Sequence, residues 1–446
     1  MLIIGWRFFR CLRSIIIKSL CLLSLSLAQG PFNGYGIGTL QNWTSPSEAG
    51  ASSIGLVPSY RSGIALSNPT TWHNLRFTFL SISYNGFESS LKNSSKNGYS
   101  NLQSAQFIIP IKQKHALGIE LHPYSYQKID LVDSLEQDFI AFDDTLSIEK
   151  QFNQAGGVMA FDFSASTVLL NKTNLGFTFQ FLFGSSRQNN SLLIDKIPYT
   201  ISSRLNYSGV NTLLYANTNI KNFNIFFKTS FSLKPLDAIE TKLYPYFDTN
   251  KNGYHDFVYD YLNPGYDFPH PNDVPEPETG RLTNIHDYSS LSIGISKIFI
   301  KRLQLSIELE NNSDNSDFNS QIPNSFNSRI VNSNYLSIGL IWFPNEKSFR
   351  FIDNFTFRSG LSFNNFLIDD FSSSDNDRIK SNNNISEFGY SIGLGYKFKS
   401  VGNQIDFTYH SSLRSHDNDS YGEELFRGFQ VGISIADIWF IKRRQR

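Results

Sequence analysis

Large apolar residues recur at every second position along most of the chain after residue 75. One such run holds Leu175, Phe177, Phe179, Phe181 and Phe183, and the positions between them hold Gly176, Thr178, Gln180 and Leu182. Successive side chains of a β-strand point to opposite faces, so each such strand has one apolar face and one small or polar face. Soluble β-sandwiches show the same alternation, so the connections between the strands must decide between the two classes.

Fourteen segments carry the pattern, near 75–86, 100–111, 115–131, 155–169, 174–186, 208–219, 222–233, 288–299, 303–312, 332–343, 350–364, 384–398, 403–414 and 425–440. Short connections, most of which contain Lys, alternate strictly with long ones that are rich in Asn, Ser and Asp. The long ones are roughly 87–99, 132–154, 187–207, 234–287, 313–331, 365–383 and 415–424. Short periplasmic turns, long extracellular loops and an even number of strands are typical of bacterial outer-membrane barrels. We therefore predict an all-β fold, a transmembrane antiparallel β-barrel of about 14 strands within residues 75–446.

The composition agrees with a membrane barrel, although a soluble all-β protein is the alternative. Of the 446 residues, 15% are aromatic and 17% are charged, whereas soluble domains have about 25% charged residues. Charge on the lipid face costs about 2–4 kcal/mol at the membrane midplane, so the Phe, Leu, Ile and Tyr faces are predicted to point outward. Aromatic residues near strand ends are candidates for interfacial girdles, namely Tyr124, Tyr126, Tyr335, Trp342, Phe343, Trp439 and Phe440.

Residues 1–28 read as a signal peptide. A basic region that ends at Lys18 precedes the apolar stretch 19–27, and small residues precede a cleavage site after Ala28. Both cysteines, Cys11 and Cys21, lie in this leader, so the mature chain offers neither a disulfide nor a thiol nucleophile. The mature chain also has no basic excess, which argues against a nucleic-acid partner. We expect export to the outer membrane of a Gram-negative-type bacterium.

Residues 29–74 do not follow the alternation, and such irregular chain cannot lie in lipid. This segment either fills the lumen as a plug or hangs in the periplasm. A 14-stranded barrel encloses more space than its own side chains fill, so we predict a plug. It opens on a glycine-rich stretch with Gly36 and Gly38, and closes on Asn68-Pro69-Thr70.

The glycine-rich start, the Ala49-Gly50 stretch and Asn68-Pro69-Thr70 before the first strand resemble the N-terminal hatch of the outer-membrane long-chain fatty-acid and hydrocarbon transporter family (FadL-like). The resemblance implies a 14-stranded barrel with a hatch, and it implies that Gly36, Gly38, Asn68 and Pro69 belong to the plug and its gate. Two features depart from the family. Thr70 stands where Ala is usual, and the chain runs on to Arg446 instead of ending on an aromatic residue.

The segment 248–260 has the spacing of a calcium loop. Oxygen-bearing side chains stand at positions 1, 3, 5 and 9, and Gly253 at position 6 allows the sharp turn. The predicted ligands are Asp248, Asn250, Asn252, the Tyr254 carbonyl, Asp256 and Asp260. Asp260 lies one residue late for the usual acid, because Tyr259 occupies position 12. The alternative is a turn stabilised by Asp and Asn side chains.

No set of residues predicts an enzyme. His410 and Ser412 share a strand face, but residues two apart on a strand lie roughly 6.6 Å apart at Cα, whereas a nucleophile and its base need about 2.6–3.2 Å. We interpret them as lumen-lining polar residues. Glu387 and Asp406 are candidate lumen charges that set solute preference, or partners of a nearby Lys.

The predicted function is passive uptake of small hydrophobic or amphipathic, fatty-acid-like solutes across the outer membrane. The alternative is a structural or binding barrel, such as a protein-secretion accessory or a surface adhesion protein. The expected partners are a small hydrophobic ligand, outer-membrane lipid with lipopolysaccharide, and the barrel-assembly machinery. The one expected cofactor is Ca²⁺ in the 248–260 loop.

Overall fold

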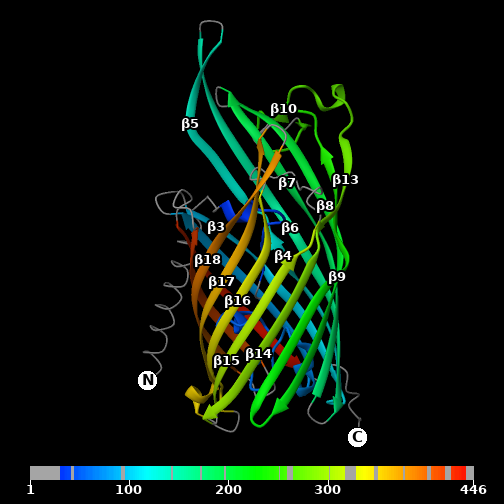
Figure 1. Ribbon diagram of the computed structural model, residues 1–446, viewed down its shortest axis with the longest axis vertical. Helices are drawn as coiled ribbons and strands as arrows, with labels where there is room; N and C mark the ends of the chain where they lie inside the picture. The colour runs from blue at the N-terminus through cyan, green and yellow to red at the C-terminus, as the bar shows by residue number, and fades with distance from the viewer. Residues whose placement is uncertain are drawn as a thin grey trace, which may run out of the picture.

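The protein is a closed barrel of 14 antiparallel strands (Figure 1). The computed structural model describes residues 31–41, 45–91, 96–141, 144–170, 173–194, 197–250, 252–258, 265–300, 302–316, 328–345, 350–374, 377–398, 403–416 and 423–437. The predicted signal peptide, Asp260, Trp439 and Phe440 lie outside these ranges. No helix within them combines the length and the apolar character that a membrane crossing needs.

The strands of the wall are neighbours in chain order. They are β2 (Thr78–Leu91), β3 (Lys96–Ile111), β4 (His115–Tyr126), β6 (Asp144–Leu170), β7 (Thr173–Ile194), β8 (Ile197–Ile220), β9 (Phe223–Lys242), β14 (Tyr288–Ile300), β15 (Leu303–Asp314), β16 (Ser328–Trp342), β17 (Phe355–Ser374), β18 (Asp377–Lys397), β19 (Gln404–His416) and β20 (Glu423–Asp437). Antiparallel pairing of β2 with β20, from Thr78–Asp437 to Leu91–Glu424, closes the barrel. The predicted 14-stranded barrel is therefore confirmed.

The predicted strand ends are accurate on the side of the short turns, except that β17 begins at Phe355 instead of residue 350, and they are wrong on the side of the long loops. There β7 continues to Ile194, and β8 begins at Ile197 instead of residue 208. Much of the predicted loops 132–154, 187–207 and 365–383 is strand. Alternation of apolar residues is required only where a strand crosses lipid, so polar strand extensions carry no such signal.

Smaller elements extend the wall on the loop side (Figure 1). β5 (Ile129–Ala141) pairs with β6, and β13 (Glu278–His286) pairs with β9. β10 (Tyr246–Phe247) pairs with β8, and β11 (Phe257–Val258) forms a separate hairpin with β12 (Gly265–Tyr266). Two short 3₁₀ helices, η3 (Pro271–Asp273) and η4 (Phe351–Asn354), lie in connections between strands.

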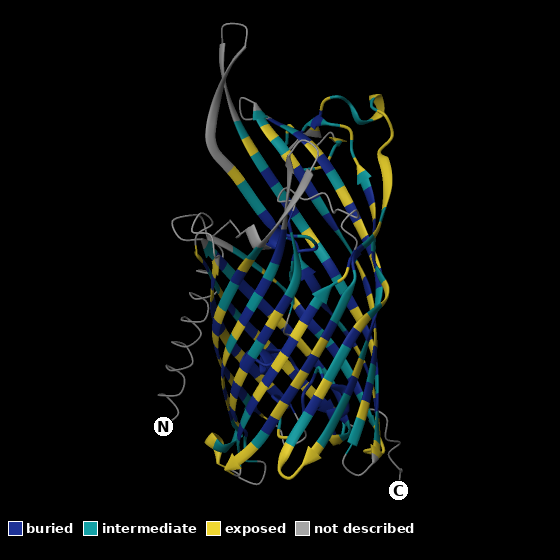
Figure 2. Ribbon diagram, in the orientation of Figure 1, coloured by how far each residue is buried: buried dark blue, intermediate teal, exposed yellow. Residues whose placement is uncertain are grey.

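Burial alternates along each wall strand (Figure 2). On β7, Phe179, Phe181 and Phe183 are exposed on the outer face, whereas Thr178 and Gln180 are buried inside. The predicted orientation of the apolar faces is therefore confirmed. The girdle prediction is wrong for Tyr124, Tyr335 and Phe343, which are buried, while Trp342 is exposed. An aromatic side chain near a strand end gives no information about its face, because β propensity favours it on both.

The described residues of the N-terminal segment, 33–41 and 45–75, lie against the inner face of the wall. The segment contains β1 (Thr39–Leu40), the short helix α2 (Pro46–Ala49) and the 3₁₀ helix η2 (Pro69–Asn74), and it follows the 3₁₀ turn η1 (Pro31–Gly34). α2 contacts β18, β19 and β20, whereas η2 contacts β3, β4, β6, β7 and β8. The segment thus touches opposite parts of the wall.

Glycines on the inner face of the strands let this segment approach the wall closely. A Cβ added at Gly118 would collide with the Trp72 ring, and one at Gly176 would meet Pro69 and Thr70. A Cβ at Gly360 would collide with the Ala51 carbonyl. These inward glycines therefore mark the places where the backbone of the wall meets the segment.

The wall itself is incompletely paired between β3 and β4. Their described pairing ends at Ala105 and Leu121, although both strands continue toward the loop side. There Ser125 and Tyr126 of β4 pair with β1 of the N-terminal segment. The segment therefore takes part in the wall at this point.

Candidate functional site in the barrel interior

A buried carboxylate on β15 holds the middle of the N-terminal segment. Glu308 is 1% exposed. Its oxygens accept hydrogen bonds from the backbone amides of Ile54 and Val57, both at 2.7 Å, and from the hydroxyls of Ser53 at 3.1 Å and Ser337 at 3.3 Å. Donors from the segment and from the wall thus converge on this one buried carboxyl group. Glu308 therefore fixes residues 53–57 against the wall.

A buried ion pair holds the next part of the segment. Its arginine binds carbonyl oxygens of the segment, whereas Glu308 binds backbone amides. Arg358 Nη1 lies 2.6 Å from Asp406 Oδ1, with side-chain exposures of 0% and 4%. The same guanidinium donates to the carbonyls of Ser59 at 2.8 Å and Tyr60 at 3.2 Å. Gln404 donates to both oxygens of Asp406. Every polar group of the pair is thereby engaged with the wall or the segment.

The predicted gate residues Asn68 and Pro69 form the start of η2. The Asn68 carbonyl oxygen Oδ1 accepts from the amide and hydroxyl of Thr70, and its Nδ2 donates to the Leu56 carbonyl at 2.7 Å. Asn68 is an N-cap residue, and Pro69 occupies the first helical position, where its missing N–H costs nothing. The motif thus shapes the segment internally and joins its two halves.

The predicted gate glycines lie about 30 residues earlier, near the loop end of the lumen. Gly36 and Gly38 have φ values of +53° and +87°, a left-handed conformation that L side chains rarely adopt. A Cβ at Gly38 would also collide with the carbonyl of Tyr126. The structure does not bring these glycines together with Asn68 and Pro69. Their part in gating stays a prediction.

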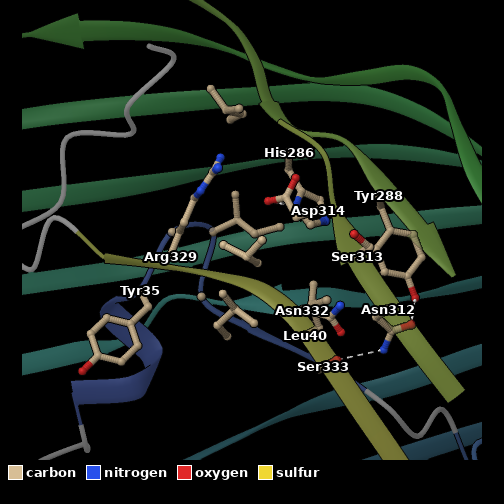
Figure 3. Close-up of a pocket in the computed structure, with 16 residues that line it drawn as sticks. Tyr35, Leu40, His286, Tyr288, Asn312, Ser313, Asp314, Arg329, Asn332 and Ser333 are labelled. Carbon is tan, nitrogen blue, oxygen red and sulfur yellow. Dashed lines mark hydrogen bonds and ion pairs between the residues drawn. The ribbon is translucent and has the colours of Figure 1, made fainter. Parts of the chain in front are cut away.

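A pocket with about 480 Å³ of empty space opens beside this glycine stretch (Figure 3). Its lining comes from residues 35–40, the end of β13, the start of β14, and the loop-side ends of β15 and β16. Tyr35, Ile37, Leu40 and Ile330 supply apolar surface, and polar groups such as Asn312 stand among them. The pocket therefore has the mixed lining of a small-molecule site.

A second cavity lies deeper in the lumen, with about 880 Å³ of empty space. It shares the lining residues Leu40, Tyr288 and Asn312 with the loop-side pocket, so the two are neighbours. Charged residues line it, namely Glu120, His122, Asp162, Lys228 and Glu310. We call this cavity the inner chamber. Among its charges, Lys228 Nζ lies 2.6 Å from Glu310 Oε2 and His122 Nε2 lies 3.3 Å from Asp162 Oδ2.

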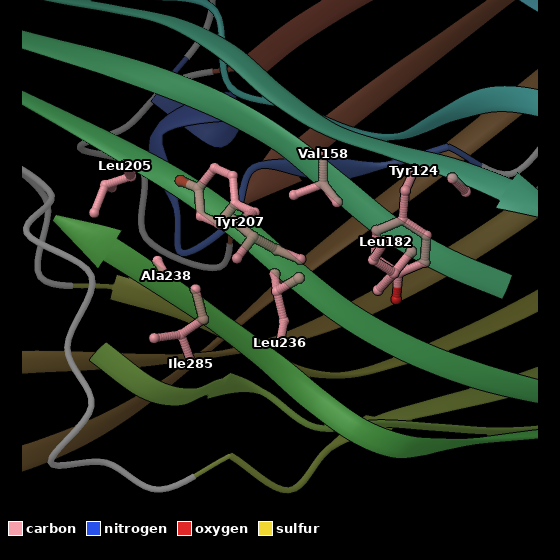
Figure 4. Packing of buried hydrophobic residues seen from close by; sticks show 10 residues of the cluster. Tyr124, Val158, Leu182, Leu205, Tyr207, Leu236, Ala238 and Ile285 are labelled. Carbon is pink, nitrogen blue, oxygen red and sulfur yellow. The ribbon is translucent and has the colours of Figure 1, made fainter. Parts of the chain in front are cut away.

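Apolar clusters occupy both ends of the lumen. Near the loops, Ile37 of the segment packs against inward residues of β4 and β6–β9 such as Val158 and Leu205 (Figure 4). Near the turns, Tyr60 and Trp72 of the segment pack with Phe79 and other residues at the strand ends. The segment and the wall thus share one apolar cluster near the turns.

The residues of the predicted calcium loop are brought together. The Asp248 carboxylate accepts from the amides of Asn252 at 3.2 Å and Gly253 at 2.6 Å, and Asn252 Nδ2 donates to Asp256 Oδ2 at 2.8 Å. Asp256 Oδ1 is buried and accepts no hydrogen bond within the described residues, as suits a cation ligand. Within the ranges that the structure describes, however, no group of three or more acidic, His or Cys side chains is arranged to hold a metal ion. Calcium binding stays a prediction.

The surroundings of this loop are acidic. Asp267 accepts hydrogen bonds from the amides of Thr249 and Asp256, and both Asp248 and Asp267 are almost fully buried. Burial first, and then these two carboxylates, raise the pKa of Tyr246. The loop therefore provides a negative electrostatic environment.

The structure gives the His410 and Ser412 pair no catalytic geometry. The His410 ring lies 5.2 Å from the Phe87 ring and 5.8 Å from the Phe426 ring. In the part of the chain that is described, no hydrogen bond joins His410 to Ser411 or Ser412.

The predicted lumen charge Glu387 pairs with Arg414 at 2.8 Å, and Asp406 pairs with Arg358, so Arg and not Lys is the partner of both.

Sequence reasoning missed Glu308 and Arg358, two wall residues that each form several hydrogen bonds with the segment. Each is a single charged residue at an inward position of an alternating strand, like several others. The signal that was available is the cost of charge in a membrane strand, which makes any such residue a candidate for a specific partner. The residues next to Glu308 or Arg358 in the chain do not indicate which residue that partner is.

The closed wall of 14 strands and the chain packed inside it define a transmembrane barrel of the FadL type. The model of the BamG family matches residues 11–445, which is nearly the whole chain. The chain therefore belongs to the BamG family. No curated protein matches it.

Solved structures agree with this fold over almost their full length. A FadL homologue from Pseudomonas aeruginosa is 14% identical, with a TM-score of 0.54, 90% of this chain covered and 98% of that chain covered. The CymD monoaromatic hydrocarbon channel is 12% identical, with a TM-score of 0.50 and coverages of 92% and 99%. The toluene transporter TbuX from Ralstonia pickettii is 12% identical, with a TM-score of 0.50 and coverages of 91% and 99%. At these identities the likeness establishes the fold.

Proposed function

We propose that this protein is an outer-membrane channel for passive uptake of small amphipathic solutes, closed at rest by residues 33–75. The observation that carries the proposal is a pair of neighbouring hollows inside the barrel, the loop-side pocket and the inner chamber, whose linings share Leu40, Tyr288 and Asn312. The lining of the loop-side pocket is mainly apolar and that of the inner chamber is mainly polar, which suits an amphipathic solute. CymD, a monoaromatic hydrocarbon channel, and TbuX, a toluene transporter, have a similar fold, which supports this proposal.

Below the chamber, passage requires the segment to move. Tyr60 and Trp72 belong to the apolar cluster near the turns, and β1 completes the wall beside β4. A displacement of the segment would open a path downward or sideways between β3 and β4. Ligand binding that favours the displaced segment would shift the population toward the open state.

A disulfide that locks the segment to the wall tests the proposal. The hydroxyls of Ser52 and Ser391 lie 2.8 Å apart, and the two cysteines of the chain both fall in the predicted leader. We expect the variant Ser52→Cys/Ser391→Cys to take up solutes in liposomes when reduced and to lose uptake when oxidised. A truncation of residues 29–74 should show higher conductance and faster uptake than the intact protein.

The controls are the two single-cysteine variants and the electrophoretic shift of the folded barrel on heating. Equal uptake by the oxidised and reduced forms would contradict a gating role of the segment. Absence of conductance and uptake in every variant, with the barrel folded, would contradict the channel itself and favour the second candidate.

The second candidate is a barrel that binds another protein and conducts nothing, such as a protein-secretion accessory or a surface adhesion protein. The observation that favours it is the dense contact between segment and wall, including the wall glycines Gly118, Gly176 and Gly360. The strand extensions on the loop side would then supply the binding surface. The barrel-assembly machinery and lipopolysaccharide stay expected partners of either candidate.

We also propose that the 248–256 loop binds Ca²⁺. Its support is the preformed set of hydrogen bonds to Asp248 and the buried Oδ1 of Asp256. Calorimetric titration of the apo protein should give saturable binding of Ca²⁺ with a Kd of about 10⁻⁴–10⁻³ M, the range of extracellular calcium modules. Binding should disappear in Asp256→Asn and persist in Asp273→Asn, which changes an exposed acid in η3. Absence of saturable heat at millimolar Ca²⁺ would refute the site.

A further inference from the structure

The inner chamber contains two carboxylates that face each other across neighbouring strands. Glu120 on β4 and Asp162 on β6 are directly opposite in the antiparallel register, and both are about nine-tenths buried. Side chains at such positions have Cβ atoms about 4.5–5.5 Å apart, and like charges there are destabilising. Two buried carboxylates at this distance require nearby positive charge or hydrogen-bond donors.

The protein satisfies this requirement only in part. Gln106 donates to Glu120 Oε2 at 3.1 Å, and His122 lies beside Asp162 Oδ2, which also accepts from Gln180 at 3.4 Å. Asp162 Oδ1 is buried and accepts no hydrogen bond from the described residues. The one lysine that lines the chamber, Lys228, is held by Glu310. An acceptor oxygen therefore remains on a residue of the chamber wall.

Apolar and aromatic side chains form much of the remaining lining, beside polar residues such as Gln41 and Ser230. Leu40, Leu56 and Leu213 line the chamber together with the rings of Tyr124, Tyr215 and Tyr288. Aromatic faces attract organic cations, and this attraction grows when water is excluded. A metal ion is the poorer fit, because the described residues contain no group of three acidic, His or Cys side chains arranged around one point.

From these observations we infer that the inner chamber binds the ammonium group of an amphipathic organic cation, with Asp162 as the carboxylate that contacts it. This inference rests on the proposed function and narrows its solute class. The facing carboxylates of Glu120 and Asp162 disfavour a carboxylate solute beside them, so a fatty-acid anion is the poorer ligand of this chamber.

Binding of matched aromatic probes tests the inference. The intact barrel in lipid nanodiscs is titrated calorimetrically with 2-phenylethylammonium, 2-phenylethanol and 3-phenylpropanoate, which differ mainly in charge. We expect the ammonium compound to bind most tightly and the carboxylate most weakly. Asp162→Asn is nearly isosteric and should weaken ammonium binding by about tenfold or more. Asp273→Asn, which removes the same charge from an exposed loop, should leave it unchanged.

Equal affinity of the three probes, or equal ammonium affinity in wild type and Asp162→Asn, would overturn the inference. Glu120→Gln provides a second variant and should also weaken ammonium binding. Liposome uptake separates this inference from the proposed function. Uptake of the neutral probe without selective ammonium binding would leave the channel standing and refute the cation site, whereas selective binding without uptake of any probe would support the site and refute the channel.

Discussion

Replacement of Arg358 by alanine is expected to lower the free energy of unfolding by about 3–5 kcal/mol, the usual cost of removing one partner of a buried ion pair. The change leaves the Asp406 carboxylate in a buried site without its counter-charge, and the carbonyls of Ser59 and Tyr60 lose their donors. Denaturant unfolding of the reconstituted barrel, followed by tryptophan fluorescence, measures the difference.

The control for this variant is Arg281→Ala. Arg281 also pairs with an aspartate, Asp237, at 3.1 Å, but its side chain is 68% exposed. Exposed pairs contribute about 0–1 kcal/mol, so the control should unfold almost like wild type. If Arg358→Ala and Arg281→Ala have the same stability within about 1 kcal/mol, the pair does not hold the segment as described.

Replacement of Glu308 by alanine is expected to release residues 53–57 from the wall while the barrel stays folded. The amides of Ile54 and Val57 and the hydroxyl of Ser53 then lose a charged acceptor. Each buried donor left without a partner costs about 1–3 kcal/mol. Amide hydrogen exchange at Ile54 and Val57 should therefore become faster by about tenfold or more, and solute uptake should rise.

A graded variant and a charge control sharpen this experiment. Glu308→Gln keeps one acceptor oxygen, so its exchange rates should lie between those of wild type and Glu308→Ala. Glu276→Ala removes an exposed carboxylate from the loop side and should change neither exchange nor uptake. Unchanged protection of Ile54 and Val57 in Glu308→Ala would show that the carboxylate does not hold the segment.

The two wall residues act on adjacent parts of one short stretch of chain. Glu308 binds backbone amides of residues 54 and 57, and Arg358 binds the carbonyls of residues 59 and 60. Loss of the hydrogen bonds to Glu308 and Arg358 would release this stretch of the segment as a unit, because its other contacts with the wall are weaker. This arrangement connects the packing of the segment to the proposed gating.

Several features of this protein were determined by the sequence alone. Each residue on the lipid face of a strand must itself be apolar. The alternation of apolar and polar residues therefore predicts the 14 membrane strands and most of their turn-side ends. The N-terminal segment was recognisable because irregular chain cannot satisfy its backbone groups in lipid.

Only the tertiary structure decided which residues meet inside the barrel. Strand extensions outside the membrane are stabilised by backbone pairing and need no apolar face, so the sequence contains no alternating pattern that would predict them. The partners of Glu308 lie about 250 residues away, and Arg358 and Asp406 lie 48 residues apart. The opposition of Glu120 and Asp162 depends on the register of two strands that are separated by a hairpin. The closure of the barrel and the register of its strands bring these groups together. Neither the closure nor the register can be inferred from a single residue and its neighbours in the chain.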